Sequence, residues 1–206
     1  MLIAEEFVLL ALTPDGTPAR STSYQNGYSN GVTGALLTEL ELQGHLSLDD
    51  GRIRITGTTP DHPLLRQVLD ETRSLDGKKL RSKLGLIRRS GWNEVVDGMI
   101  DAGILGRHRP NVLQPTRHPV NDPALHAAVI ARVQAAATGD QPFDRRDATL
   151  LALAGPCQLL EIVAPDRSDR KHAKARIAEA SRSVPAAEAV KYAISSRSAA
   201  VVAAST

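Results

Sequence analysis

The chain has 206 residues, of which 25 are basic and 23 acidic, so its formal net charge is only +2. A balance this even gives no global attraction to nucleic acid or to membranes, and such binding would need a local patch of charge. A single cysteine, Cys157, excludes an internal disulfide framework and suits a reducing compartment. No apolar run reaches about 18 residues and no secretory leader opens the chain, so we expect one cytoplasmic domain over residues 1–206.

The first elements are predicted to be helical. Residues 2–12 have the pattern of a short amphipathic helix, and a turn follows at 13–17. The longest helical pattern covers about 31–43, where Asn30 can cap the start and Gly44 can end the helix. This helix has few polar positions, so neighbouring helices should cover most of its circumference. We expect the fold to be built around it.

Two small β-hairpins are predicted after the central helix. In the first, over about 45–56, apolar residues alternate on both sides of Asp50-Gly51, which is a strong turn signal. The second, over about 104–115 with its return reaching Pro119, contains three prolines that should keep its strands short. The remaining segments have the 3.6-residue spacing of helices, at 64–69, 78–88, 92–103, 122–138, 144–164 with a break at 155–156, 168–183 and 185–203. The sequence therefore predicts a mainly α, single helical domain around a buried central helix.

Several motifs, in a fixed order, resemble the Golgi phosphoprotein 3 family. The central helix carries Gly-x-x-Gly at 31–34, followed by Leu-x-Glu-Leu at 37–40 and Gly-x-Leu at 44–46. Further pieces of the resemblance follow at 103–105, 116–121, 144–153 and 199–204, so it spans nearly the whole chain. The family fold is a helical domain around a buried helix with small hairpins, in agreement with the pattern of elements. The compact form, rich in alanine and arginine, resembles the bacterial branch of the family.

The resemblance implies a peripheral membrane protein. Eukaryotic members bind the headgroup of phosphatidylinositol 4-phosphate and act as adaptors that retain glycosyltransferases at the Golgi. Carried over by position, their headgroup residues fall on Tyr24, Thr33, Arg89 and Trp92, and Arg88 adds a neighbouring cation. Of the family's three arginine positions, only Arg89 keeps its charge here. The implied partners are an anionic phospholipid headgroup and a client protein.

The distribution of charge suggests where a phosphate would bind. One cluster of cations lies at 78–89 and a second at 107–118, and if the two lie side by side they form a basic face. The alternative is that both clusters are solvated faces of amphipathic elements. Trp92, next to Arg88 and Arg89, has two interpretations as well, as an interfacial anchor or as a partly buried core residue. The glycine-rich entry to the central helix, flanked by Tyr24 and Tyr28, is a further candidate for binding an anion through free backbone N–H groups, although capping by Asn30 would also explain it.

Catalysis and metal binding lack their usual motifs. The sequence has no nucleophile elbow, no phosphate-binding loop that ends in Gly-Lys-Ser/Thr and no His-x-x-x-His pair. Cys157 lies in an apolar segment, where a buried unreactive thiol is expected. We therefore expect a non-enzymatic protein that needs no metal or organic cofactor.

The sequence is compatible with two classes of function. The first is a peripheral adaptor on anionic lipids, or an adaptor acting through proteins alone. The second is a nucleic-acid binder, because a helix followed by an Asp-Gly hairpin can form half of a winged helix. The central helix carries Glu39 and Glu41, which would repel phosphates, so nucleic acid is the less favoured partner.

Overall fold

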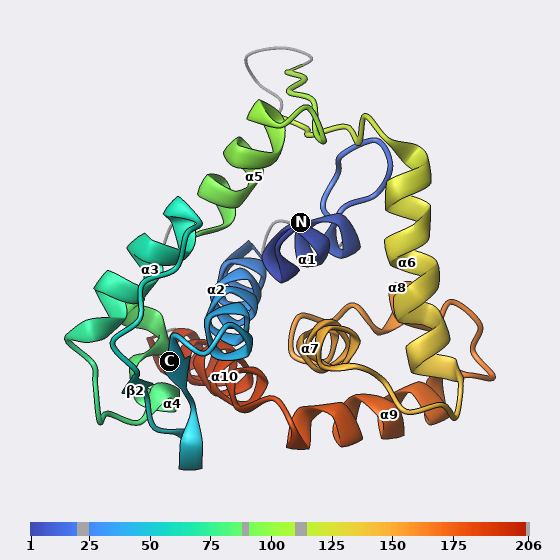
Figure 1. Ribbon diagram of the computed structural model, residues 1–206. Coiled ribbons are helices and arrows are strands. Elements are labelled where there is room, and N and C mark those ends of the chain that lie inside the picture. The colour runs from blue at the N-terminus through green and yellow to red at the C-terminus, as the bar shows by residue number, and fades with distance from the viewer. Residues whose placement is uncertain (20–24, 88–90, 110–114, 205–206) are drawn as a thin grey trace.

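Helix α2 (Gln25–Leu42) lies in the middle of the molecule, with α1 (Ile3–Ala11) beside it and the other helices around this pair (Figure 1). The computed structural model describes residues 1–19, 25–87, 91–109 and 115–204. Within these ranges ten α-helices and one two-stranded sheet form a mainly α domain around one hydrophobic core, as predicted.

The central helix begins earlier than the sequence predicted. It starts at Gln25 rather than at residue 31, so Asn30 lies inside the helix and does not cap it. Gly31 and Gly34 are also internal, and they allow close packing: an added Cβ would lie 2.3 Å from Phe7 Cζ at Gly31 and 2.8 Å from Val190 Cγ2 at Gly34. The two glycines therefore serve helix packing and do not supply free N–H groups for an anion. Neither interpretation of residues 30–34, as an anion site or as a cap by Asn30, therefore agrees with the structure.

Burial at the centre is shared between two helices. Leu36, Leu37 and Leu40 of α2 have no exposed surface, as predicted. Helix α1 was expected to be amphipathic, yet every residue from Ile3 to Ala11 except Glu5 is buried. Its C-terminal carbonyls at Leu9 and Leu12 are each 3.1 Å from Nε2 of the buried His126, which satisfies polar groups that the helix leaves unpaired. The core is therefore organised around α1 and α2 together.

The first hairpin forms with the predicted turn but is very short. Strand β1 (Leu46–Ser47) pairs antiparallel with β2 (Arg54–Ile55), Leu46 opposite Ile55. The turn between them includes the 3₁₀ segment η2 (Asp49–Gly51), where Asp50 and Gly51 both have positive φ, at 50° and 66°. An Asp-Gly pair favours this backbone conformation.

The second predicted hairpin, 104–115, is a ribbon held by isolated bridges. Leu105 bridges to Val120 and His108 to Arg117, so the return arm runs beyond residue 115. Its tip at 110–114 lies outside the described residues. Prolines at 115 and 119 cannot donate to a ladder, and this prevents regular strands.

Helices α3 (Pro63–Arg73) and α5 (Gly91–Asp101) form much of one side of the molecule (Figure 1). The helix predicted for residues 78–88 is wrong in length, because only α4 (Leu80–Lys83) and the 3₁₀ turn η3 (Leu84–Leu86) form there. Leu80, Leu84 and Ile87 are all buried, which explains why the spacing resembled a continuous helix. Residues 88–90 lie outside the described residues.

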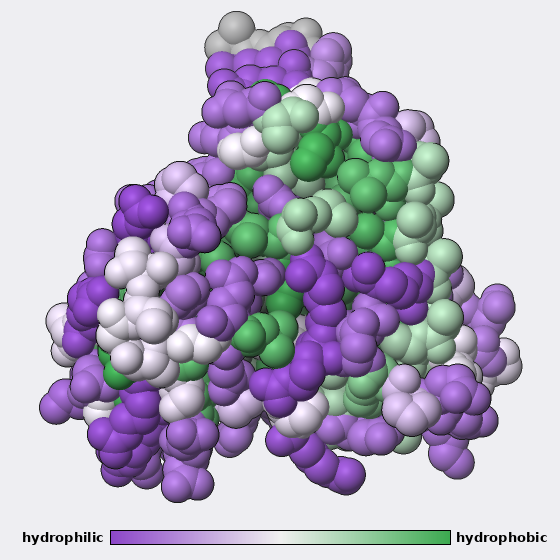
Figure 2. Space-filling model, viewed as in Figure 1, coloured by the Kyte–Doolittle hydropathy of each residue, from purple (hydrophilic) through white to green (hydrophobic). Residues whose placement is uncertain are grey.

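The C-terminal half forms the other side of the molecule. Asp122 caps α6 (Pro123–Thr138), accepting hydrogen bonds of 3.0 Å from the N–H groups of Ala124 and Leu125. The chain then forms α7 (Arg145–Ala154), the short α8 (Leu160–Val163), α9 (Arg170–Arg182) and α10 (Pro185–Ala204), and the break between α7 and α8 falls at Gly155-Pro156 as predicted. Figure 2 shows hydrophobic residues at the surface over α1 and α6.

A cluster of ion pairs joins α1, α2, α6 and α7. Glu6, only 3% exposed, lies 2.9 Å from Nε of Arg146 and 3.0 Å from Nη2 of Arg132. Glu39 is also buried, and it accepts a 2.8 Å hydrogen bond from the N–H of Ile3. Glu39 is thus part of the interior and was not, as the sequence suggested, an exposed charge on the central helix.

Candidate functional site

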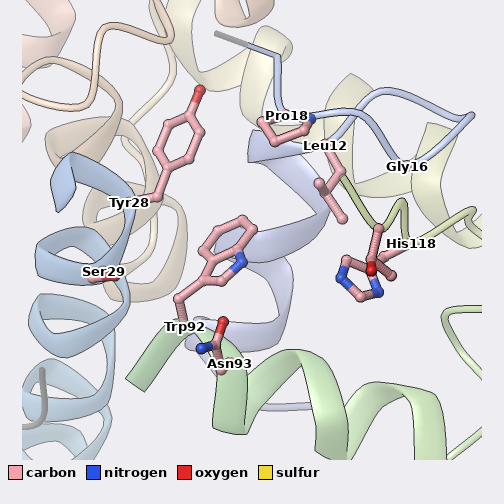
Figure 3. Close-up of a pocket in the computed structure, with 9 residues that line it drawn as sticks. Leu12, Gly16, Pro18, Tyr28, Ser29, Trp92, Asn93 and His118 are labelled. Carbon is pink, nitrogen blue, oxygen red and sulfur yellow. The ribbon is translucent and has the colours of Figure 1, made fainter. Parts of the chain in front are cut away.

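A cavity of about 250 Å³ lies where α2, α5 and the loop after α1 meet (Figure 3). Residues from four separate parts of the sequence line it, including Leu12, Pro18, Tyr28, Ser29, Trp92 and His118. Its walls combine aromatic rings with hydroxyl, amide and imidazole groups. This is the composition of a small-molecule site, in which apolar walls fix a ligand and a few polar groups orient it.

One wall of the cavity is an aromatic stack. The Trp92 indole from α5 lies on the ring of Tyr28 from α2, with centroids 5.5 Å apart and planes inclined by 24°. Tyr28 in turn makes an edge contact with Phe7 of α1, with centroids 6.5 Å apart. Tyr28 is 1% exposed whereas Trp92 is half-buried, so the indole is the member of the stack that a ligand can reach.

The opposite wall is formed by the turn at 13–17 against residues 116–118. Gly16 has a φ of 77°, and an added Cβ would lie 2.1 Å from the carbonyl carbon of His118, so only glycine fits there. The carbonyl of Gly16 accepts a hydrogen bond of 3.2 Å from the His118 N–H. Hydrogen bonds from Thr13 and Thr17 lower the pKa of Asp15, whose carboxylate pairs with Arg117 at 3.3 Å.

His118 brings a polar atom to this wall that has no hydrogen-bond partner in the described part of the chain. Its ring nitrogen Nδ1 is buried. Burial lowers the pKa of His118, and the neighbouring Arg107 lowers it further, against opposing effects of Gly106 and Asp97. Burial therefore favours the neutral imidazole, whose buried Nδ1 has no hydrogen-bond partner among the described residues.

The structure separates the residues predicted to bind a headgroup. Trp92 lines the cavity. Thr33 is 2% exposed, and its hydroxyl donates to the Ser29 carbonyl at 3.0 Å, so it lies beneath the lining and cannot replace an arginine there. Tyr24, Arg88 and Arg89 lie outside the described residues.

The two basic clusters differ in their pairing. In the second cluster, Arg107 pairs with Asp97 at 2.6 Å and Arg117 with Asp15 at 3.3 Å, in agreement with a solvated surface. In the first cluster Lys78, Lys79 and Arg81 are exposed, and no carboxylate of the described residues forms an ion pair with them. Leu86, next to this cluster, is 62% exposed. These three cations of the first cluster therefore keep their positive charge available.

Sequence reasoning missed His118 and Asn93 as residues that line the cavity. Tyr28 was noted only as a residue near a helix start, and His118 only as part of a charge cluster. No local signal links residues 28, 92 and 118, because they meet only through the packing of α1, α2 and α5.

The family model of Golgi phosphoprotein 3 (GPP34) matches residues 3–197. The chain belongs to the Golgi phosphoprotein 3 family. This is a family of non-enzymatic adaptors, and the match confirms the resemblance seen in the sequence. Among the described residues of this family member, no helix is both long and apolar enough to span a bilayer. In the same ranges no group of three or more His, Cys, Asp or Glu side chains is placed to hold a metal ion.

Proposed function

We propose that this family member is a peripheral membrane adaptor that docks on anionic lipid headgroups at the Trp92 cavity. The observation that carries the proposal is the position of Trp92. It lines an open cavity, and in the sequence it directly follows a segment with unpaired cations and an exposed leucine. Family membership supports the adaptor role.

Each part of this surface has a physical role at a bilayer. An indole prefers the headgroup zone, where its ring and its N–H are both accommodated. Lys78 is an exposed cation, and the exposed Leu86 can enter the acyl boundary. Each cation near an anionic surface contributes about 1 kcal/mol, so Lys78 together with Arg88 and Arg89 would provide attraction that depends on salt.

Within the cavity, the polar lining would orient the headgroup. The imidazole of His118 and the amide of Asn93 would offer hydrogen bonds. The family resemblance makes Arg89, which lies outside the described residues, the expected partner of the phosphate. Thr33, which is buried and uncharged, and Trp92 take the places of two arginines, so two of the three cations of the eukaryotic site are missing. We therefore expect weak discrimination between phosphoinositides and other anionic lipids.

The structure gives less support to nucleic acid as a partner. A recognition helix must present an exposed face to the major groove. In α2, Val32, Ala35, Leu36, Leu37 and Leu40 are all buried, and the helix is enclosed by α1, α5, α7 and α10. An adaptor that acts through proteins alone is the second candidate, and it predicts no vesicle binding.

The direct test uses Trp92 as a reporter, because it is the only tryptophan. Phosphatidylglycerol vesicles containing lipids brominated along the acyl chain should quench its fluorescence, and phosphatidylcholine vesicles should not. Quenching should weaken as salt is raised. Absence of binding to every anionic vesicle would leave only the protein-adaptor role.

A double variant, Arg88→Ala with Arg89→Ala, tests the cations. It should release the protein from anionic vesicles in a flotation assay, with no change in circular dichroism. The matched control is Arg73→Ala with Arg167→Ala, which removes the same charge at two exposed positions outside the cavity and should leave binding nearly unchanged. Retained binding by the Arg88 and Arg89 variant would place the lipid site elsewhere.

A further inference from the structure

A second surface hollow lies on the side of α9 and α10, away from the residues that line the Trp92 cavity. Two depressions, of about 570 and 430 Å³, share Ser181, Arg182 and Glu188 and so form one groove. The first depression has a floor of small or apolar residues, Gly155, Pro156, Ile177, Ala178 and Ala187. The second continues along the start of α10 to α4. We call the whole the α9–α10 groove.

Cations line the α9–α10 groove from end to end. Lys174 and Lys191 lie in the first depression, Arg182 lies where the two depressions meet, and Lys79 and Arg81 lie in the second. Glu188 is shared by both depressions, and Asp50 lies in the second. The groove therefore carries a clear excess of positive charge over an apolar floor.

Unlike several surface arginines, these cations form no ion pair with a carboxylate in the described part of the chain. Arg73, Arg107 and Arg170 pair with carboxylates at 3.0, 2.6 and 3.1 Å. Lys174, Arg182 and Lys191 form no ion pair with any described residue, although Glu188 is nearby. Unpaired cations around an apolar floor are a surface that an anionic partner complements.

At the far end of the groove, an aromatic contact fixes one cation. The Arg81 guanidinium carbon lies 4.6 Å from the centroid of the Tyr192 ring, so α4 and α10 hold this charge in place without a carboxylate. The groove thus ends in a positioned guanidinium, which retains its full charge for a ligand.

We propose that the α9–α10 groove binds an extended segment of a client protein in which acidic residues alternate with apolar ones. In an extended chain, successive side chains point to opposite sides. Apolar side chains would therefore lie on the floor around Ile177 while carboxylates reach the cations on the rims. This second proposal depends on the adaptor part of the proposed function and does not require that the protein binds lipid.

A protein segment fits the groove better than a bilayer or a single phosphate. The cations are spread along two depressions, whereas one phosphate needs donors that converge on a point. A flat headgroup layer does not reach the apolar floor of a concave groove. Glu188 in the middle of the groove would also repel a compact polyanion.

The test measures binding of fluorescein-labelled peptides by anisotropy, with the full chain and no membrane. The probe peptide alternates Glu and Leu, and one control peptide replaces every Glu by Gln and another replaces every Leu by Ser. Only the first peptide should bind well, because it alone supplies both charge and apolar contact. No binding of the Glu-Leu peptide, or equal binding of all three, would overturn the proposal.

Charge reversal at Arg182 and Lys191 locates the site. The double variant Arg182→Glu with Lys191→Glu should weaken Glu-Leu peptide binding about tenfold or more, and it should gain binding to a Lys-Leu peptide. The matched control is Arg54→Glu with Arg167→Glu, which makes the same change at two exposed positions outside the groove and should leave affinity nearly unchanged. Gain of Lys-Leu binding shows that the reversed protein is folded.

Removing the carboxylate in the groove gives an independent test. Glu188→Gln should strengthen binding of the Glu-Leu peptide severalfold, since repulsion is lost. If duplex DNA or anionic vesicles displaced the peptide from the wild-type groove, the groove would be a general polyanion surface and the proposal would be wrong. Vesicle binding through the Trp92 cavity is measured with separate variants, so failure of one proposal leaves the other intact.

Discussion

The indole of Trp92 stacks on the ring of Tyr28, and the two rings lie on different helices, α5 and α2, with centroids 5.5 Å apart. This contact joins the core to the candidate site, because Tyr28 also touches Phe7 of α1. Tyr28, a residue of the core, therefore fixes the orientation of the Trp92 indole at the cavity.

Replacing Tyr28 by Leu should destabilise the protein by about 1–3 kcal/mol, since it removes two aromatic contacts and leaves unfilled volume. Urea denaturation would measure the loss. Tyr192→Leu is the control, because Tyr192 is 42% exposed and its contact with Arg81 is worth about 0.5–1 kcal/mol. Equal effects of the two substitutions would contradict the role of Tyr28 in the core.

Truncation of the central helix should be costly at its buried positions. Leu37→Ala and Leu40→Ala should each lower the free energy of unfolding by about 2–5 kcal/mol, because both side chains are fully buried. Leu42→Ala, at the end of the same helix and 40% exposed, should cost less than about 1 kcal/mol. Chemical denaturation of the three variants side by side checks this order.

The ion pairs around Glu6 should matter more than pairs on the surface. Glu6→Ala leaves Arg132 and Arg146 without their shared carboxylate, and we expect a loss of about 2–4 kcal/mol. Arg73→Ala breaks an exposed pair with Asp70 and should change stability by at most about 0.5 kcal/mol. Thermal and urea unfolding would both register the difference, and a Glu6 variant as stable as wild type would show that the buried pairs contribute nothing.

Acid should weaken the fold through His118. Burial lowers the pKa of this imidazole below its ordinary value of about 6.5. Below this pH the unfolded chain binds a proton at His118 more readily than the folded chain does. The free energy of unfolding therefore has its full value above about pH 6.5 and falls as the pH drops below it. His118→Gln should reduce this loss, whereas His108→Gln, at an exposed position, should not. The measurement is the free energy of unfolding across that pH range.

Cys157 should be unreactive in the folded protein. Its side chain is 1% exposed, burial raises the pKa of the thiol, and Sγ donates to the Gly27 carbonyl at 3.4 Å. A thiol reagent such as Ellman's should modify it only after denaturant is added. Rapid labelling of the native protein would show that the α2 and α7 ends separate readily.

Much of the helical framework could be predicted from local signals. Asp122 and Asp144 cap α6 and α7, and Gly155-Pro156 interrupts the helical pattern that follows. Asp50-Gly51 specified its turn because these residues tolerate positive φ. Where local signals competed with packing, prediction was wrong: Asn30 resembles a cap, yet burial of Tyr28 extends α2 past it to Gln25.

The sequence by itself determined the family and the class of fold, because these depend on residue order and on periodic burial. Only the tertiary structure decided which residues share a site. Tyr28, Trp92 and His118 are far apart in the chain and meet because α1, α2 and α5 pack together, and Lys79 joins Arg182 and Lys191 in one groove because α4 packs on α10. The burial of Glu39 also could not be predicted from the sequence. A carboxylate on a helix has no pattern that marks it as exposed or buried, and here the N–H of Ile3 and the cation of Arg146 hold it in the interior.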